Sequence, residues 1–483
     1  MIGREHQLRQ GGEPPCAASP RSSLMRAGLN QERADNPGTL RPEFVLLGCG
    51  EAGANQSRGT ISETRAMSRS FRNPCRGHRT RRPGVLRVGS GWVRACLAGA
   101  LIGLGAVAVV GCGAAVSARS NAGRPARLSF QNVPGSPFGV AVTTGGRFAF
   151  VDLIDGRVRV YSLAGGRPRA IRTISVGGEA VGCSLTQDGR LLLIADGQGA
   201  TVVDVARAET GAPDPVLGSL RPPVSAHLRA AGAIETNSSS DGRYVFVSLE
   251  YGTPDGAVAV YDLGDDRHPR FGPDDWVGSA PLGQEVVGSA LSPSGTQLYV
   301  TSEVAATAGT GQAALKHDGT LSVLNVARLE HTPARAVIAT VPAGLQPVRD
   351  AVSPDGATVW VTARASNRLL AFSAHRLTSN PAHAQIGATK VGTAPVGLAL
   401  LDSGRRALVA DSDRFNAAGA HSALTVVNTS RALAHRSANV ATLRAGGFPR
   451  EIAIDPHDNV ALVTNFGSDQ LEVVTFLEGS LRP

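Results

Sequence analysis

Cysteine is scarce in this chain of 483 residues, and its spacing suits neither a metal site nor a disulfide framework. Six cysteines are present, and only Cys183 lies beyond residue 128, so that part of the chain contains no internal disulfide. The sequence also lacks C-x-x-C, C-x-x-C-H and any His/Cys group at metal-binding spacing. We therefore expect no cofactor and no bound metal, and a role that depends on a redox cofactor is disfavoured.

Aromatic residues and catalytic motifs are sparse as well. Aromatics make up 4% of the chain and include three tryptophans, which is few for the stacking platforms that bind sugars or single-stranded nucleic acid. G-x-S-x-G, H-E-x-x-H and P-loop patterns are absent from residues 128–478. No familiar catalytic motif therefore points to a reaction.

Net positive charge is missing from the larger part of the chain. Residues 1–111 carry 16 arginines and no lysine against 7 acidic residues, whereas residues 112–483 carry 32 basic and 32 acidic residues. The formal charge of +9 therefore lies entirely upstream of Cys112. A neutral body cannot neutralise many phosphates, so we expect no nucleic acid as a partner.

An uncharged apolar run over 95–111 follows a flank rich in arginine, as in the n-region and h-region of an export signal. It ends in Val109-Val110-Gly111-Cys112, which resembles the bacterial lipobox. The resemblance implies cleavage before Cys112 and an anchor of lipid on that cysteine in the cell membrane. The alternative is an uncleaved transmembrane helix over 95–116. Both interpretations place the C-terminal body outside the cytoplasm.

The chain divides accordingly. Residues 1–66 lack hydrophobic periodicity, and we expect them to be disordered or untranslated, with Met67 as a start. Residues 67–111 then form the signal peptide, and residues 112–127 comprise the lipidated cysteine and a flexible tether. Residues 128–478 form the folded body, and residues 479–483 are a C-terminal tail.

The folded body repeats one unit seven times, with a period of about 50 residues. Each unit joins a small or apolar strand, a turn of Asp-Gly type and a β-branched strand, as in LLLIA or YVFVS. The copies begin at Ser136, Glu179, Ala233, Glu285, Gln346, Ala394 and Phe448. One such sheet cannot bury both faces alone, so units of this length stack radially.

The sequence therefore predicts an all-β fold, a single β-propeller of seven four-stranded antiparallel blades. An extra strand over 127–133 precedes the first unit, and we expect it to close the ring against the last strand, 471–476. We expect the propeller to be monomeric.

Two of the copies contain the tetrapeptides YVTS at residues 299–302 and LVTN at residues 462–465. These resemble the YVTN repeat of YncE-like and surface-layer propellers, and the resemblance covers nearly all of residues 128–478. Related propellers include lactonases, amine-dehydrogenase heavy chains and the haem domains of nitrite reductases. The resemblance therefore implies a fold but leaves the chemistry open.

The aligned units also point to a candidate site. The innermost strands begin with Gly139, Gly182, Glu235, Gly288, Arg349, Gly397 and Glu451. Glycine permits close approach of backbones, so the three charged residues stand out, together with the neighbouring Asp350 and Arg450. In one interpretation these five charged residues bind a ligand or ion at the channel mouth. In the other, charges of adjacent blades pair, for example Arg349 with Asp350 or Glu451, and close the channel.

Three functions remain open. The leading hypothesis is a membrane-tethered extracytoplasmic module that binds an unknown protein, polymer or small molecule through its channel mouth or its long loops, 206–231, 264–283, 303–317 and 413–422. The alternative is a lactonase-like hydrolase, in which Glu235 or Glu451 activates water and Arg349 stabilises the oxyanion. A redox subunit of amine-dehydrogenase type is the third hypothesis.

Overall fold

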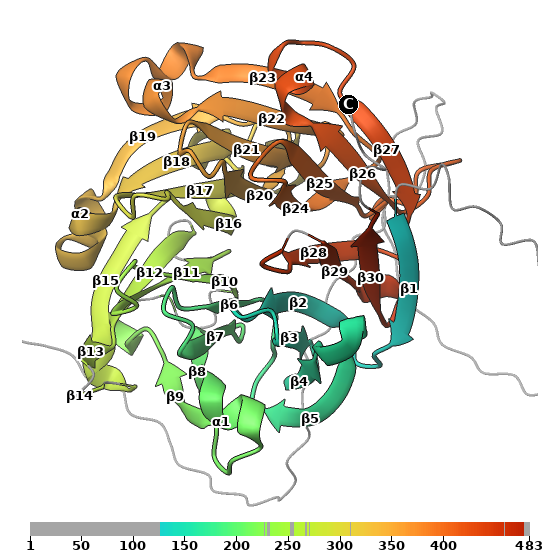
Figure 1. The fold of residues 1–483 in the computed structure, drawn as a ribbon. Helices are drawn as coiled ribbons and strands as arrows, with labels where there is room; N and C mark the ends of the chain where they lie inside the picture. The colour runs from blue at the N-terminus through green and yellow to red at the C-terminus, as the bar shows by residue number, and fades with distance from the viewer. Residues whose placement is uncertain are drawn as a thin grey trace, which may run out of the picture. The chain divides into compact units, whose positions relative to one another are not determined.

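The structure, a computed structural model, describes residues 126–477 apart from 227, 229–231, 252–255, 266–267, 270, 310 and 458. These residues form seven four-stranded antiparallel sheets, arranged as blades around a central axis (Figure 1). The predicted all-β fold of seven blades is thus confirmed. The signal peptide, Cys112, the alternative transmembrane helix and the tail 479–483 lie outside the described residues.

Each blade runs from an inner strand beside the axis to an outer strand at the periphery. The inner strands are β2 (Pro137–Val142), β6 (Cys183–Leu185), β10 (Ala233–Ser238), β16 (Gln284–Leu291), β20 (Pro347–Val352), β24 (Pro395–Leu401) and β28 (Pro449–Ile454). The second strands are β3 (Phe148–Leu153), β7 (Leu191–Ala195), β11 (Tyr244–Leu249), β17 (Gln297–Val304), β21 (Thr358–Ala363), β25 (Arg406–Asp411) and β29 (Val460–Asn465).

The third strands are β4 (Arg157–Ser162), β8 (Ala200–Asp204), β12 (Ala257–Asp262), β18 (Thr320–Asn325), β22 (Arg368–Ser373), β26 (Ala423–Asn428) and β30 (Gln470–Phe476). The outer strands are β5 (Arg169–Ser175), β9 (Val216–Leu220), β15 (Trp276–Pro281), β19 (Val337–Pro342), β23 (Gln385–Lys390), β27 (Asn439–Arg444) and β1 (Ala126–Asn132). A short hairpin, β13 (Gly264–Asp265) and β14 (His268–Pro269), lies beside the third blade.

The seventh blade joins the two ends of the described chain. Strand β1 pairs antiparallel with β30, in a register that runs from Ala126 opposite Phe476 to Asn132 opposite Gln470. The outer strand of this blade therefore comes from the N-terminal side, while its other three strands come from the C-terminal side (Figure 1). The predicted closure of the ring is confirmed.

The turns between the inner and second strands follow from their sequence. In the second blade, Gly189 adopts a φ of 71°, which favours glycine over other residues. Thr186 donates a hydrogen bond from Oγ1 to Asp188 Oδ1 at 2.6 Å, and the same oxygen accepts from the backbone nitrogen of Arg190. The short polar side chains thus form hydrogen bonds with each other and with a backbone N–H group of the turn.

Short helices connect the third and outer strands of four blades, namely α1 (Val205–Thr210), α2 (Val326–His331), α3 (Ala374–Ser379) and α4 (Thr429–Leu433). The last residue of each third strand caps its helix, because the side chains of Asp204, Asn325, Ser373 and Asn428 accept from the backbone nitrogen three residues later. That later residue is an arginine in all four cases. This four-residue pattern is a repeat signal that sequence analysis missed.

The segments read as long loops contain strands as well. The range 206–231 includes the outer strand β9, and the range 264–283 includes the outer strand β15. Both outer strands contain glycine and are mostly half-buried, so their composition lacks the continuous apolar run of an inner or second strand. Short 3₁₀ turns occupy other connections: Ala164–Gly166, Val224–Ala226, Pro273–Asp275, Ala306–Ala308, Gly311–Lys316, Pro333–Arg335, Pro381–His383 and Phe466–Ser468.

The core lies between neighbouring blades. Trp360 of the fifth blade, for example, packs with Val409 of the sixth, and Tyr299 of the fourth packs with Val361 of the fifth. Each sheet is therefore covered on both faces by its neighbours, as the repeat argument requires. Among the described residues, no helix combines the length and apolar character needed to cross a membrane.

Candidate functional site

A register shift near the start of the inner strands shapes the channel. It occurs in six of the seven inner strands. In β20 the pairing steps from Pro347 to Asp350, so Val348 and Arg349 together oppose Thr362. An extra residue of this kind bends a strand and re-aims its side chains. The shift thus places two neighbouring layers of side chains around the axis. They lie at the end of the ring where the inner strands begin, which we call the top face.

A threonine in the second strand of three blades holds this geometry in place. Thr362 Oγ1 accepts a hydrogen bond from the Arg349 backbone nitrogen at 3.1 Å and donates to the Val396 carbonyl of the next blade at 2.9 Å. Thr301 and Thr464 make the same two kinds of contact in their blades. One hydroxyl group therefore holds the shifted inner strand and links two adjacent blades, which explains why threonine occupies this position.

The first layer is an apolar collar around the axis. It consists of one buried side chain from each of the first six blades: Phe138, Val181, Ile234, Val287, Val348 and Val396. These six pack into a single hydrophobic cluster although they come from six different blades. In the seventh blade the equivalent residue is Arg450, which directly follows Pro449 as Val348 follows Pro347.

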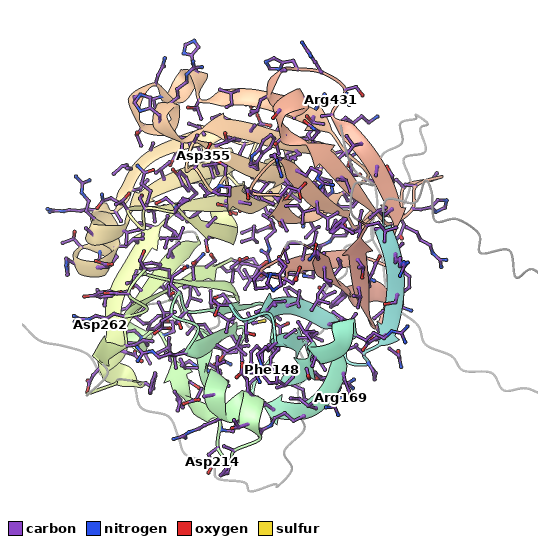
Figure 2. All side chains as sticks on the ribbon, viewed as in Figure 1. Phe148, Arg169, Asp214, Asp262, Asp355 and Arg431 are labelled. Carbon is purple, nitrogen blue, oxygen red and sulfur yellow. The ribbon has the colours of Figure 1, made fainter. Side chains whose placement is uncertain are left out.

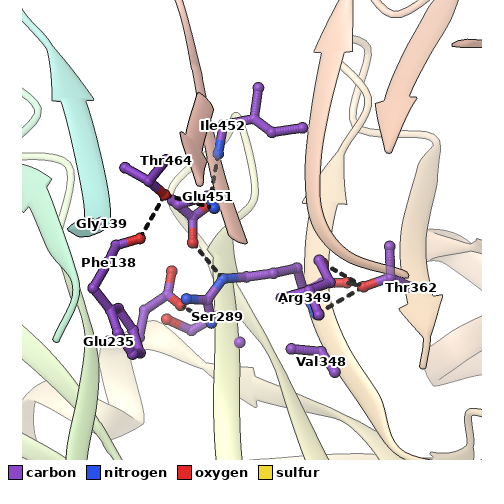
Figure 3. Close-up of polar contacts among 12 residues, drawn as sticks. Phe138, Gly139, Glu235, Ser289, Val348, Arg349, Thr362, Glu451, Ile452 and Thr464 are labelled. Atoms are coloured by element: carbon purple, nitrogen blue, oxygen red, sulfur yellow. Dashed lines mark hydrogen bonds and ion pairs between the residues drawn. The ribbon is translucent and has the colours of Figure 1, made fainter. Parts of the chain in front are cut away.

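The second layer, one residue further along each strand, holds the predicted charges. Arg349 Nη1 lies 2.5 Å from Glu235 Oε2, and Arg349 Nε donates to Glu451 Oε2 at 2.8 Å (Figure 3). The side chains are 7%, 22% and 18% exposed for Arg349, Glu235 and Glu451. We call these three residues, from the fifth, third and seventh blades, the channel ion cluster. Its pairing matches the interpretation in which charges of different blades close the channel.

Glycine occupies the other four positions of this layer, as the aligned units showed. A Cβ on Gly182 would lie 2.3 Å from the Ile234 carbonyl oxygen, and one on Gly288 would lie 2.2 Å from the Val348 carbonyl oxygen. Any larger residue would push neighbouring blades apart at these points. The glycines thus bring the inner strands close enough for Arg349 to span the channel.

Burial changes the acidity of the channel ion cluster. It raises the pKa of Glu235 to about 8, although Arg349 acts in the opposite direction; Glu451 and Asp350 add to the rise. The contact of Glu235 with Arg349 is an ion pair without hydrogen-bond geometry. Burial therefore favours the neutral form of Glu235 despite its ion pair with Arg349.

Asp350 follows Arg349 in β20 but stands apart from the channel ion cluster. Neither of its carboxylate oxygens has a hydrogen-bond partner among the described residues. A Cβ on Gly288 would lie 2.9 Å from its Oδ1, which places the carboxylate against the neighbouring blade. Burial raises the pKa of Asp350 to about 8 against the effect of Arg349. The equivalent positions of three other blades hold the buried apolar residues Val140, Leu398 and Ile452.

Arg450 also stands apart, within the collar. Its Cζ lies 3.4 Å from the centroid of the Phe138 ring and about 6 Å from those of Phe448 and Phe466. Its Nε is buried without a hydrogen-bond partner, and no ion pair joins its guanidinium to any described residue. Burial, with the nearby Arg349 and Arg414, lowers the pKa of Arg450 to about 9.

Sequence analysis missed a third group of charges, which lies on the top face of the third to sixth blades. We call Glu250, Glu285, Glu303, Arg364 and Arg414 the rim cluster; these residues lie at strand ends or in the loops that follow. Arg364 pairs with Glu303 and donates to Gln346 Oε1 at 3.0 Å. Burial and then the charge of Glu303 raise the pKa values of Glu250 and Glu285 to about 7.

Two aromatic side chains stand beside the rim cluster. Tyr251, next to Glu250, is 56% exposed, and Phe415, next to Arg414, is 52% exposed. The Arg364 guanidinium lies 5.9 Å from the Phe415 ring. Tyrosine and phenylalanine exposed beside arginine are typical of surfaces that bind other molecules. No sequence motif marks Tyr251, Phe415 or the charged residues next to them, so the sequence alone did not single them out.

Among residues 126–477 as described, no group of three or more His, Cys, Asp or Glu side chains is placed to hold a metal ion. Of the five candidate residues, the structure brings together Glu235, Arg349 and Glu451, and it separates Asp350 and Arg450 from them. The lipidation candidate Cys112 lies outside the described residues.

Comparisons with known proteins agree with this architecture at the level of fold. The chain is similar to a solved chain of hydrazine synthase from Kuenenia stuttgartiensis, with a TM-score of 0.55 and 14% sequence identity. The similarity covers 71% of this chain and 96% of that chain. No protein-family model matches the sequence, and no curated protein sequence matches it. The structure and the comparison together define a seven-bladed β-propeller.

Proposed function

We propose that this chain is an extracytoplasmic binding module of YVTN type, anchored to the cell membrane by lipid on Cys112, that recognises a ligand on its top face. The observation that carries the proposal is the pairing of Arg349 with both Glu235 and Glu451. This pairing occupies the channel charges, whereas Arg450, Tyr251 and Phe415 stay available on the top face.

The kind of ligand follows from the same surface. A propeller presents its loops on a rigid scaffold, and such loops commonly carry recognition. The body of the chain is electrically balanced, which disfavours nucleic acid and leaves a protein, a polymer or a small molecule as the ligand. We propose that the propeller acts as a monomer, because its seven blades already close the ring.

Lactone hydrolysis at the channel ion cluster is the second candidate. The observation in its favour is the pKa of about 8 at Glu235, which lies near the neutral pH at which a catalytic group exchanges protons most effectively. The ion pair with Arg349 counts against it, because a group that must activate water has to reach the water. The redox-subunit hypothesis gains no support from the described part of the chain.

A lactone panel tests the choice between these two functions. We expect no hydrolysis above background by the chain from Ser117 onward, and no change in the Glu235→Gln and Glu451→Gln variants. A chelator control accompanies each assay. Hydrolysis that either substitution abolishes would establish an enzyme at the channel ion cluster and overturn the binding-module proposal.

The anchor is tested separately by metabolic labelling with an alkyne-bearing fatty acid. We expect the full-length chain to incorporate the label and the Cys112→Ser variant to lose it completely, because the thiol is the acceptor of the lipid. Cys96→Ser, within the same apolar run, is the matched control and keeps the label. A membrane-bound chain that is never labelled would favour the uncleaved transmembrane helix instead.

A further inference from the structure

One of the seven equivalent positions in the layer of the collar holds a residue whose chemistry does not fit the role of the other six. Phe138, Val181, Ile234, Val287, Val348 and Val396 are apolar and buried, as expected for side chains that pack on the axis. Arg450 occupies the seventh position. A valine there would complete the collar without the desolvation of a guanidinium, so the arginine lowers stability relative to its six equivalents.

No carboxylate lies close enough to Arg450 to form a direct ion pair among the described residues, although Glu250 and Glu451 act on its charge from further away. The two buried arginines of this face are paired: Arg349 with Glu235 and Glu451, and Arg364 with Glu303. Arg450 makes no ion pair with a described residue, and its Nε lacks a hydrogen-bond partner. Burial and the neighbouring arginines lower the pKa of Arg450 more than Glu250 and Glu451 raise it, so the guanidinium has room for a further negative charge.

The surroundings of Arg450 indicate what kind of anion fits. Phe138 lies 3.4 Å from its Cζ, against the face of the planar guanidinium. A guanidinium covered on its face keeps its N–H groups in the plane, where they match the two oxygens of a carboxylate. Phe448 and Phe466, with ring centroids about 6 Å from Cζ, provide apolar contacts beside it.

We propose that Arg450 binds the carboxylate of a ligand that approaches the top face with an apolar group attached to that carboxylate. The inference deepens the proposed function, on which it rests, by naming the chemistry of the ligand. Two sources share this chemistry: a free aromatic or branched carboxylic acid, and an acidic residue beside an aromatic residue in a peptide. Tyr251 and Phe415, exposed on the same face, are available to the apolar group.

Glu250 gives the proposal a distinctive consequence. Its carboxylate interacts with Arg450, and no ion pair joins it to another described residue. An incoming carboxylate competes with the negative charge of Glu250. Removing that charge by Glu250→Gln is therefore expected to tighten the binding of carboxylates, which a merely structural role of Arg450 does not predict.

The experiment titrates the full-length protein with 4-fluorophenylacetate and follows the ligand by ¹⁹F NMR. The neutral 4-fluorophenylacetamide and the peptide acetyl-Phe-Asp-amide are tested in parallel, the peptide by its displacement of the fluorinated acid. We expect the acid to bind at least about tenfold more tightly than the amide, because a charged hydrogen-bonded pair contributes about 1.5–3 kcal/mol. Displacement by the peptide assigns the peptide source, and its failure assigns the free acid.

Arg450→Val is the decisive variant, since valine is the residue that Val348 and Val396 supply at this position and the collar should remain packed. We expect it to weaken binding of the acid at least about tenfold. Arg450→Lys keeps the charge without the planar fork and is expected to fall between the two. Arg431→Val, on α4 at the outer edge of the ring, is the matched control and leaves binding unchanged (Figure 2).

Two results would overturn the inference: no carboxylate binding by the wild-type chain, or equal binding by wild type and the Arg450 variants. Partner capture that persists in Arg450→Val would keep the binding-module function while removing this site. Lactone hydrolysis together with intact carboxylate binding would overturn the binding-module function and leave the site in place. The two proposals therefore fail independently.

Discussion

Replacing Arg349 by methionine is expected to lower the free energy of unfolding by about 3–5 kcal/mol. The substitution keeps the apolar stem but removes the cation that Glu235 and Glu451 share at 2.5 and 2.8 Å. Glu235 and Glu451 are then left in the channel without their shared ion-pair partner, and burying two unpaired carboxylates lowers stability more than removing all three charged groups would. Urea unfolding of the wild type and the variant at pH 7.5 measures the loss.

Rescue distinguishes this cause from simple loss of packing. The triple variant with Glu235→Gln and Glu451→Gln added to Arg349→Met is expected to recover most of the stability, because no unpaired charge remains. Arg376→Met, on the exposed helix α3 of the same blade, is the matched control and changes the midpoint little. A loss below about 1 kcal/mol in Arg349→Met would mean that the channel ion cluster behaves like a surface ion pair.

Asp350→Asn is expected to stabilise the chain at pH 8 and above, by about 1–3 kcal/mol. Burial raises the pKa of Asp350 to about 8 from an ordinary value of 3.8, so the folded state holds this proton more tightly than the unfolded state. The stability linked to that proton is complete below about pH 4 and declines as the pH rises to about 8. The variant lacks the titrating group and loses this part of the pH dependence.

The measurement is the free energy of unfolding between pH 4 and pH 9 for the wild type and Asp350→Asn. Asp355→Asn, in the turn after β20, is a control of opposite sign. A hydrogen bond from Ser353 lowers the pKa of Asp355, so the stability it contributes is present at neutral pH and declines in acid. Parallel pH curves for the wild type and Asp350→Asn would contradict the assignment of an unpaired buried carboxylate.

Local sequence was sufficient to predict the blades. The Asp-Gly turns, the β-branched second strands and the seven equivalent starts of the inner strands depend on contacts within a few residues or with the next unit. The outer strands β9 and β15 were harder to recognise, because a half-buried edge strand has no continuous apolar run. The capped helices were recognisable in principle from the arginine that follows each cap by three residues.

The candidate site was predictable in part. The aligned units placed Glu235, Arg349 and Glu451 in one layer, and the structure confirms that they meet. The collar was predictable from the same alignment of the units, because the residue directly before this layer is apolar in six units and is Arg450 in the seventh. The rim cluster could not be predicted. Glu250 and Arg364 follow second strands and Glu303 lies near the end of one, and the loops at these points differ in length and composition.

The sequence by itself determined the all-β class, the number of blades, the closure by the N-terminal strand and the residues that line the axis, because a repeat of this length has one way to bury both faces of every sheet. Only the tertiary structure decided which charges pair. Arg349 lies more than a hundred residues from both of its partners, and ring closure rather than sequence distance brings three blades together around it. The same closure leaves Arg450 Nε and both carboxylate oxygens of Asp350 without hydrogen-bond partners among the described residues.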